Sequence, residues 1–177
     1  MALTAPQRQP DPRIRVMIVD DSAVIRGLVS RWLEAEPQFE VVGSCIDGMD
    51  AVKRAPDMRP DVIVLDIEMP RMDGLTALPK LLEAAPGARI IMASTLTQRG
   101  AEVTIKALSL GAMDYIAKPD AGKLAGAADY KRLLIDKLTA LGLPRARSRA
   151  AHPSTPAPSA PAASRAPGPT SSAPAAR

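Results

Sequence analysis

Acidic and basic side chains stand at the ends of apolar runs. Asp20 and Asp21 close IRVMIVDD, Asp66 closes DVIVLD, and Lys118 closes DYIAK. Carboxylates gathered in one crevice are costly unless a cation neutralises them. Oxygen ligands without His or Cys favour Mg²⁺ over zinc. The pattern indicates a magnesium site, in which Asp66 could bind the metal, attack a substrate or merely end a turn.

Each residue alone also has a simpler interpretation. Asp21 and Ser22 are good N-cap residues for a following helix. Asp66 could end its strand in a turn, and Lys118 could be a solvated charge. The combination is more informative, because unrelated turn and cap residues have no reason to share one rim in this order.

The elements that would position these side chains alternate along the chain. Apolar runs of strand type occupy residues 14–20, 39–45, 61–66, 88–94 and 114–118. Amphipathic helical patterns occupy residues 22–36, 48–58, 74–84, 97–110 and 122–142. This alternation predicts an α/β fold with a parallel five-stranded sheet and helices on both faces. Active groups in such sheets gather at the carboxyl ends of the strands.

Composition divides the 177 residues into an apolar body and two polar ends. Residues 1–12 are rich in Pro and Gln, and residues 144–177 contain Pro, Ala, Ser, Thr and Arg with no large apolar side chain. We expect both ends to be disordered, with one domain over residues 13–143. The formal charge of +4 includes five Arg of the tail, so the body is nearly neutral and gives little reason to expect nucleic-acid binding.

Several classes of protein are disfavoured by missing motifs. There is no phosphate-binding loop of the G-x-x-x-x-G-K-[ST] type, no dinucleotide fingerprint and no G-x-S-x-G elbow. The only histidine, His152, lies in the tail. The single Cys45 suits a reducing compartment, and no run suggests a signal peptide or a membrane span. We expect a soluble cytoplasmic protein with no membrane insertion.

Taken together, Asp20-Asp21, Asp66, Ser94, Tyr115 and Lys118-Pro119 resemble the signature of a response-regulator receiver domain over about residues 13–143. The segments LDIEMPRMDG and MASTLTQRGAEVTIKALSLGAMDYIAKP are similar to the receiver of chemotaxis-type protein-glutamate methylesterases. In that family a receiver and a linker precede an esterase domain. The resemblance implies a flavodoxin-like, doubly wound sheet and a phosphorelay function in chemotaxis adaptation.

The resemblance also implies a role for each site residue. Asp66 would accept a phosphoryl group from a histidine kinase. Mg²⁺ would be held by Asp20, Asp21, Asp66 and the backbone carbonyl of Glu68. Lys118 would neutralise phosphoryl charge, Ser94 would donate a hydrogen bond to the phosphoryl group, and Tyr115 would follow this change. Pro119 would be preceded by a cis peptide bond.

Two other functions stay open from the sequence. A stand-alone receiver acting by protein contact would carry out the same phosphorylation chemistry. An aspartate-nucleophile phosphatase would need a second Asp two residues after the nucleophile, where Glu68 stands. The esterase's serine, histidine and aspartate have no counterparts here, so activity as an enzyme is not assigned. An esterase domain or a chemoreceptor complex is a possible partner implied by the resemblance.

Overall fold

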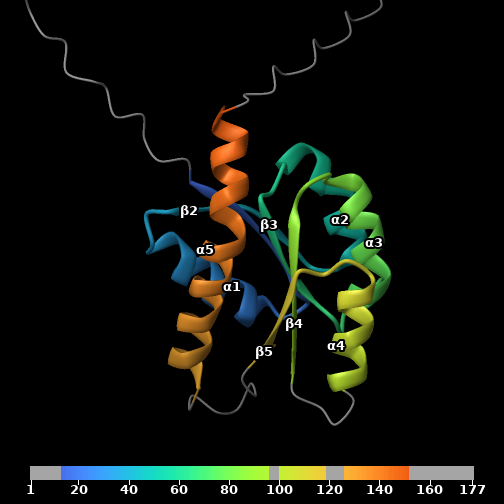
Figure 1. The fold of residues 1–177 in the computed structure, drawn as a ribbon. Helices are drawn as coiled ribbons and strands as arrows, with labels where there is room; N and C mark the ends of the chain where they lie inside the picture. Colours follow the sequence, from blue (N-terminus) through green and yellow to red (C-terminus); the bar gives the residue numbers. More distant parts are fainter. Residues whose placement is uncertain (1–12, 96–99, 119–125, 152–177) are drawn as a thin grey trace, which may run out of the picture.

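The computed structural model describes residues 13–95, 100–118 and 126–151. Five strands and five helices alternate along these residues, as the sequence predicted (Figure 1). The strands are β1 (Ile14–Val19), β2 (Phe39–Cys45), β3 (Val62–Asp66), β4 (Arg89–Thr95) and β5 (Asp114–Lys118). The helices are α1 (Ala23–Glu34), α2 (Gly48–Met58), α3 (Gly74–Ala84), α4 (Gly100–Ser109) and α5 (Ala127–Ala151).

The strands form one parallel sheet in the order β2-β1-β3-β4-β5. The chain passes from β1 outward to β2 and then returns to β3 on the other side of β1. The strand order therefore reverses between β1 and β3, and ligands of open parallel sheets bind beside such a point. Asp20 and Asp21 follow β1 and Asp66 ends β3, so the acidic residues lie at this position. The predicted fold class is confirmed.

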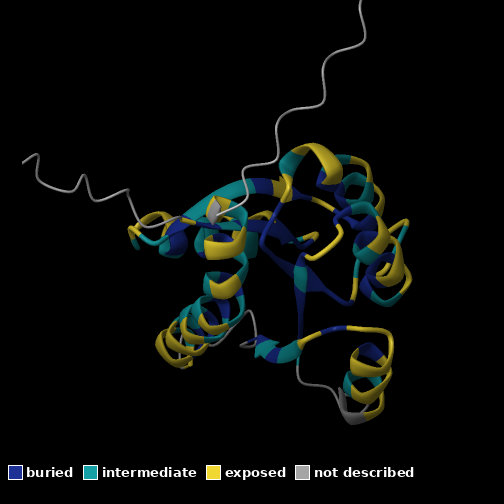
Figure 2. Cartoon of the chain, turned by 45° about the horizontal axis from the view of Figure 1, so that its top comes forward, coloured by how far each residue is buried: buried dark blue, intermediate teal, exposed yellow. Residues whose placement is uncertain are grey.

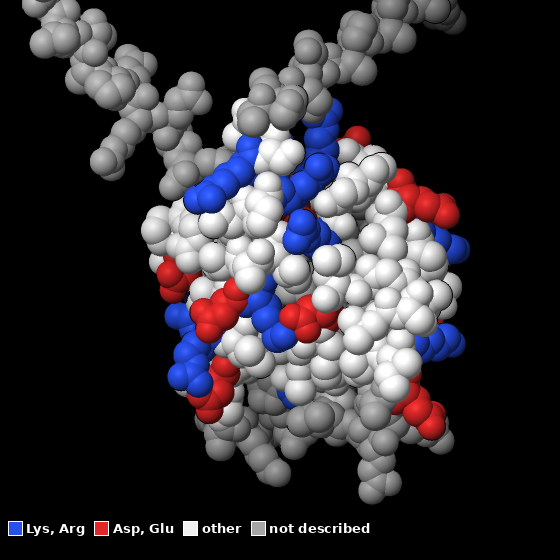
Figure 3. Space-filling view, viewed as in Figure 1, with Lys and Arg blue, Asp and Glu red and all other residues white. Residues whose placement is uncertain are grey.

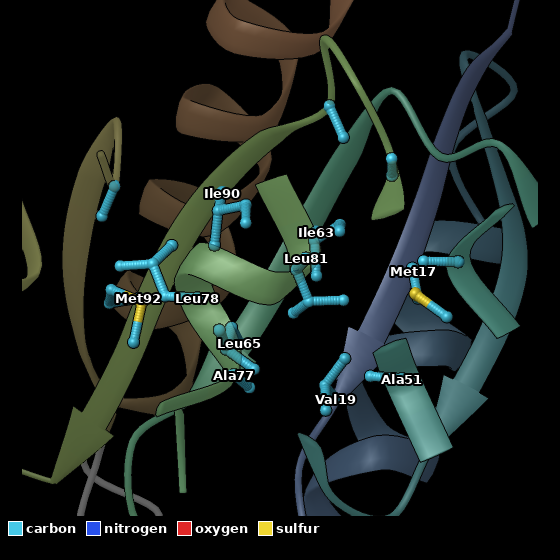
Figure 4. Packing of buried hydrophobic residues seen from close by; sticks show 14 of the residues in the cluster. Met17, Val19, Ala51, Ile63, Leu65, Ala77, Leu78, Leu81, Ile90 and Met92 are labelled. Carbon is cyan, nitrogen blue, oxygen red and sulfur yellow. The ribbon is translucent and has the colours of Figure 1, made fainter. Parts of the chain in front are cut away.

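Alternate residues of the strands point to opposite faces of the sheet and pack into two separate hydrophobic cores. On one face, Met17, Val19, Ile63, Leu65, Ile90 and Met92 pack against small and aliphatic side chains of α2 and α3 (Figure 4). On the other face, Ile14, Val16, Ile18, Val62, Val64 and Ile91 pack against α1 and α5. The central strands β1, β3 and β4 are buried on both sides, while the outer surfaces of the helices are exposed (Figure 2). This explains why these three strands are almost continuously aliphatic in sequence.

The end of α5 corrects the predicted domain boundary. The helix continues to Ala151, so residues 144–151 are helical rather than part of a disordered tail. Ala146 is completely buried, and Arg149 donates from Nε and Nη2 to the carboxylate of the buried Asp61 at 3.1 and 3.0 Å. The composition suggested disorder, whereas tertiary contacts hold this turn in place. Residues 1–12 and 152–177 lie outside the described residues.

A pocket of about 440 Å³ lies at the amino ends of the strands, and its lining does not include Asp20, Asp21 or Asp66. Its lining includes Arg59, Asp61, Arg145 and Arg149. Arginines of this region are engaged with the chain: Arg145 donates to the carbonyl of Pro86 at 3.0 Å and Arg149 pairs with Asp61. Figure 3 shows basic side chains gathered where α5 ends. Arg145 lies beside the carboxyl end of α3, where a cation is favourable. We therefore attribute the pocket and its arginines to the packing of α5 against the sheet.

Candidate functional site

The three aspartates predicted to form a metal site lie together at the carboxyl ends of β1 and β3. Asp20, Asp21 and Asp66 each offer a carboxylate oxygen within 4.8 Å of the others. Asp20 and Asp66 are only 3% exposed, whereas Asp21 is exposed. One side of the cluster is therefore open to a ligand, and the other is closed by protein.

Lys118 brings a positive charge to this cluster from the end of β5. Its Nζ lies 2.9 Å from Oδ2 of Asp20 and 2.8 Å from Oδ1 of Asp66, and the side chain is almost buried. Burial opposes the charged amine, but the hydrogen bonds and charges of Asp66 and Asp20 outweigh it and raise the pKa of Lys118. Lys118 is therefore an ammonium at neutral pH.

Burial acts in the opposite direction on Asp66. It raises the pKa of this carboxyl from its ordinary value of 3.8, and the negative charge of Asp20 adds to the effect. The hydrogen bond and charge of Lys118 oppose the rise, as does the N–H of Ile67, which donates to Oδ1 at 2.8 Å. Three carboxylates facing one ammonium leave an excess of negative charge, which a divalent cation would offset.

Local backbone contacts fix the position of Asp20. Its Oδ1 accepts from the N–H of Ser22 at 2.9 Å, and its carbonyl accepts from Nη1 of Arg26 at 2.7 Å. Ser22 is the N-cap of α1, because its side chain accepts from the N–H of Ile25. The cap is thus Ser22, and the side chain of Asp21 has no part in it.

The segment that follows Asp66 is equally constrained. The N–H of Gly74 donates to the carbonyl of Ile67 at 2.9 Å, and Asp73 caps α3 by accepting from the N–H of Thr76 at 2.7 Å. A Cβ on Gly74 would lie 2.0 Å from the carbonyl oxygen of Asp66. Only glycine permits α3 to begin this close to the strand. The side chain of Glu68 is exposed.

The remaining predicted residues lie beside the cluster or beyond the description. Ser94 is nearly buried near the end of β4, and its Oγ donates to the carbonyl of Thr95 at 3.2 Å rather than to an acid. Tyr115, in β5, is partly buried and packs against the core shared with α4. Pro119 and its peptide bond lie outside the described residues, so the predicted cis bond stays a prediction.

Sequence reasoning missed a further acidic residue, which follows β2 at the same edge of the sheet. Asp47 is completely buried and caps α2, accepting from the N–H of Asp50 at 2.9 Å, and it forms an ion pair with Arg71. Burial would raise the pKa of Asp47, but the N–H of Asp50 and the Arg71 guanidinium together lower it. Asp47-Gly48 directly before a helical pattern is a cap signal that could have been read. The pairing with Arg71 has no signal in the sequence.

The cluster suits magnesium in its donor chemistry. All three side chains offer oxygen, and none of the grouped residues is His or Cys. Hard cations such as Mg²⁺ prefer carboxylate and carbonyl oxygens with water. The residues present fit such an ion, which the carboxylates of Asp20, Asp21 and Asp66 could hold.

Comparison with known proteins decides the family. The family model for the response regulator receiver domain matches residues 16–129, which contain the acidic cluster, Ser94 and Lys118. The chain belongs to the response-regulator receiver family. Phosphorylation on an aspartate by a kinase is typical of this family, so receiver membership disfavours the phosphatase alternative.

Sequence relatives indicate which kind of receiver this is. The protein-glutamate methylesterase/protein-glutamine glutaminase of Maricaulis maris is 51% identical over 170 residues, covering 92% of this chain and 42% of that protein. The enzyme numbered 2 of Caulobacter vibrioides is 58% identical over 143 residues, covering 81% and 40%. The chain therefore resembles the receiver of these chemotaxis methylesterases and spans about two fifths of their length.

Solved structures agree. The response regulator domain of Thermotoga maritima CheB matches with a TM-score of 0.67 and 39% identity, covering 73% of this chain and 96% of that domain. A CheX–CheY complex of Borrelia burgdorferi containing BeF3 and Mg matches with a TM-score of 0.61 and 28% identity, covering 72% and 87%. Within the described part of the chain, no helix has the length and apolar character needed to span a bilayer.

Proposed function

We propose that this receiver accepts a phosphoryl group on Asp66 from the phosphohistidine of a chemotaxis-type histidine kinase. The observation that supports this most is the setting of the Asp66 carboxylate. It is 3% exposed at the end of β3, lies 2.8 Å from the Lys118 ammonium and shares the acidic cluster with Asp20 and Asp21. A carboxylate is a weak nucleophile, so positioned charges must supply most of the rate enhancement.

The transfer exchanges one bond for another. An oxygen of Asp66 attacks phosphorus, and the P–N bond to the kinase imidazole breaks with its electron pair passing to nitrogen. The imidazole nitrogen then takes a proton from water, and Asp66 becomes an acyl phosphate. Ile67 N–H and Lys118 both engage Oδ1. Oδ2 is therefore the oxygen that the described residues leave for the attack.

The acidic residues would bind the metal ion, and Lys118 would compensate the charge of the phosphoryl group. Mg²⁺, when bound, would neutralise developing charge on the phosphoryl oxygens. Asp20, Asp21, Asp66 and the carbonyl of Glu68 would hold it. Lys118, which now pairs with Asp20 and Asp66, would contact a phosphoryl oxygen instead. The ammonium would thus compensate the charge that phosphorylation adds.

The response to phosphorylation would pass through Ser94 and Tyr115. Ser94 would turn its hydroxyl from the carbonyl of Thr95 to a phosphoryl oxygen. Tyr115 stands on the neighbouring strand β5, where Met92 pairs with Tyr115 and Ser94 with Ala117. A shift of Ser94 would therefore change the position of Tyr115 and the surface formed by α4, β5 and α5. The cis bond before Pro119 belongs to the same proposal.

The output of the receiver would be control of receptor methylesterase activity during chemotaxis adaptation. The methylesterase relatives support this, and an esterase domain or a chemoreceptor complex would be the partner. A stand-alone receiver remains the alternative and differs only in its partner. A cytoplasmic location is part of the proposal, because the unpaired Cys45 suits a reducing compartment.

Phosphoryl incorporation from acetyl phosphate tests the chemistry without the kinase. The wild-type chain should incorporate one phosphoryl group in Mg²⁺ and none in EDTA, and Asp66→Asn should incorporate none. Asp73→Asn is the matched control, because Asp73 lies in the same segment and Asn also caps helices. Lys118→Gln should fold yet react slowly. Full incorporation by Asp66→Asn would refute the proposal.

A further inference from the structure

The segment between Asp66 and α3, residues 67–73, is tied to the start of α2 by two contacts. We name this segment the phosphoacceptor loop. The N–H of Gly48, the first residue of α2, donates to the carbonyl of Met72 at 3.2 Å. The guanidinium of Arg71 forms an ion pair with the carboxylate of Asp47, the N-cap of α2. Neither contact was anticipated by the receiver signature.

The buried carboxylate of Asp47 depends on this ion pair for the compensation of its charge. Its side chain is 0% exposed, and its Oδ1 accepts from the N–H of Asp50. Its Oδ2 is buried and has no ordinary hydrogen bond within the described residues, and the oxygen is in ion-pair contact with the Arg71 guanidinium. A buried carboxylate without a partner is strongly unfavourable. Arg71 itself is 55% exposed, so this charge reaches Asp47 from the surface.

The loop adopts an uncommon backbone conformation at the same residue. Arg71 has φ +62°, in the left-handed region that residues other than glycine rarely occupy. The N–H of Met72 donates to the carbonyl of Pro70 at 2.7 Å, which makes a tight turn around Arg71. Such conformations persist when the surroundings hold them. Here the surroundings are the ion pair and the Gly48–Met72 hydrogen bond.

These contacts complete the support of the loop. Next to Asp66, the N–H of Ile67 donates to the carbonyl of Ala93, and the N–H of Gly74 donates to the carbonyl of Ile67. Between the two ends lies Glu68, whose carbonyl is the proposed backbone ligand of Mg²⁺. We propose that Asp47 and Arg71 are positioning residues, which hold the phosphoacceptor loop in the conformation that binds the divalent cation. This rests on the proposed function and extends it to two residues outside the metal cluster.

Titration with Mg²⁺ tests the proposal without phosphorylation. Calorimetry of the full 177-residue chain gives the dissociation constant directly. Groups that support metal ligands typically change metal affinity by about 10- to 100-fold when removed, so Arg71→Gln should raise the dissociation constant at least about tenfold. Arg71→Lys, which keeps the charge, should recover part of the affinity.

Arg54→Gln is the matched control. Arg54 also pairs with an aspartate of α2, its Nη1 lying 3.2 Å from Asp50, and it donates to the carbonyl of Ser44 rather than to the loop. The proposal expects Arg54→Gln to bind Mg²⁺ like the wild type. A loss as large as that of Arg71→Gln would show a general effect of surface charge and would overturn the proposal.

A double variant separates positioning from simple neutralisation of a buried charge. In Asp47→Asn/Arg71→Gln the unpaired carboxylate is gone, so thermal stability should recover relative to Arg71→Gln. If the pair positions the loop, Mg²⁺ affinity should stay weak in the double variant. Wild-type affinity in either Arg71→Gln or the double variant would overturn the inference, and the double variant still decides if Arg71→Gln fails to fold.

The two proposals fail in different ways. If the wild type binds Mg²⁺ and labels Asp66 from acetyl phosphate while Arg71→Gln binds Mg²⁺ equally well, only the positioning role is wrong. If the wild type binds Mg²⁺ but Asp66 is not labelled, the proposed function is wrong. The positioning role of Arg71 is then still decided by the Mg²⁺ affinity of Arg71→Gln.

Discussion

Replacing Arg149 by Gln should destabilise the fold, although this residue lies in a segment whose composition suggested disorder. Asp61 is 1% exposed and accepts from Arg149 Nε and Nη2 and from the N–H of Arg15, at 3.1, 3.0 and 2.9 Å. Removing one partner of a buried ion pair costs about 3–5 kcal/mol. Arg149 is 32% exposed, and the N–H of Arg15 would remain, so solvent screening reduces the expected loss to about 2 kcal/mol.

Urea unfolding followed by circular dichroism measures this loss. With a slope of about 1–3 kcal/mol per molar urea, a loss of about 2 kcal/mol lowers the midpoint by about 1 M. Arg147→Gln is the control, because Arg147 lies on the same turn and is exposed. It should stay within about 0.5 kcal/mol of the wild type. Equal midpoints for Arg149→Gln and the wild type would refute the anchoring of α5 by Asp61.

Three further outcomes are expected. In EDTA, Asp66→Asn should be more stable than the wild type, because burial raises the pKa of Asp66 and so disfavours the ionised form in the folded chain. The difference should be absent well below pH 3.8 and should grow as pH rises from there through the folded pKa, which urea midpoints across pH would show; a constant difference would contradict it. Amide exchange should show protection in α5 continuing past residue 143 towards Ala151, and loss of protection at 143 would contradict the helix boundary. The purified chain should release no methanol from methylated receptor above a buffer control, since it has no G-x-S-x-G elbow and its only histidine is His152; clear release would refute this.

The sheet could be predicted from the sequence because burial on both faces leaves a plain pattern. Strands such as VIVLD are apolar at almost every position, and turn and cap residues mark their ends. The approach of Asp20, Asp21 and Asp66 followed from topology alone, since the carboxyl ends of parallel strands share one edge. Their roles came from the family resemblance rather than from spacing.

The contacts that sequence reasoning missed are long-range pairs of charged residues. Arg149 meets Asp61 across 88 positions, and Arg71 meets Asp47 from a separate loop. Each arginine alone looks like a solvated charge, because local composition carries no information about the partner. The end of α5 was misplaced for the same reason. Burial of Ala146 and pairing of Arg149 decide that boundary, and neither is visible within the segment itself.

Mapping the phosphorylated residue tests the central claim most directly. The wild-type chain is incubated with acetyl phosphate and Mg²⁺, the acyl phosphate is trapped chemically, and the modified peptide is sequenced by mass spectrometry. The modification should fall on Asp66 alone and should disappear in EDTA, because the carboxylate cluster needs a cation. A modification on any other residue of the wild type, or an unmodified Asp66 under these conditions, would contradict the assignment of Asp66 as the phosphoacceptor.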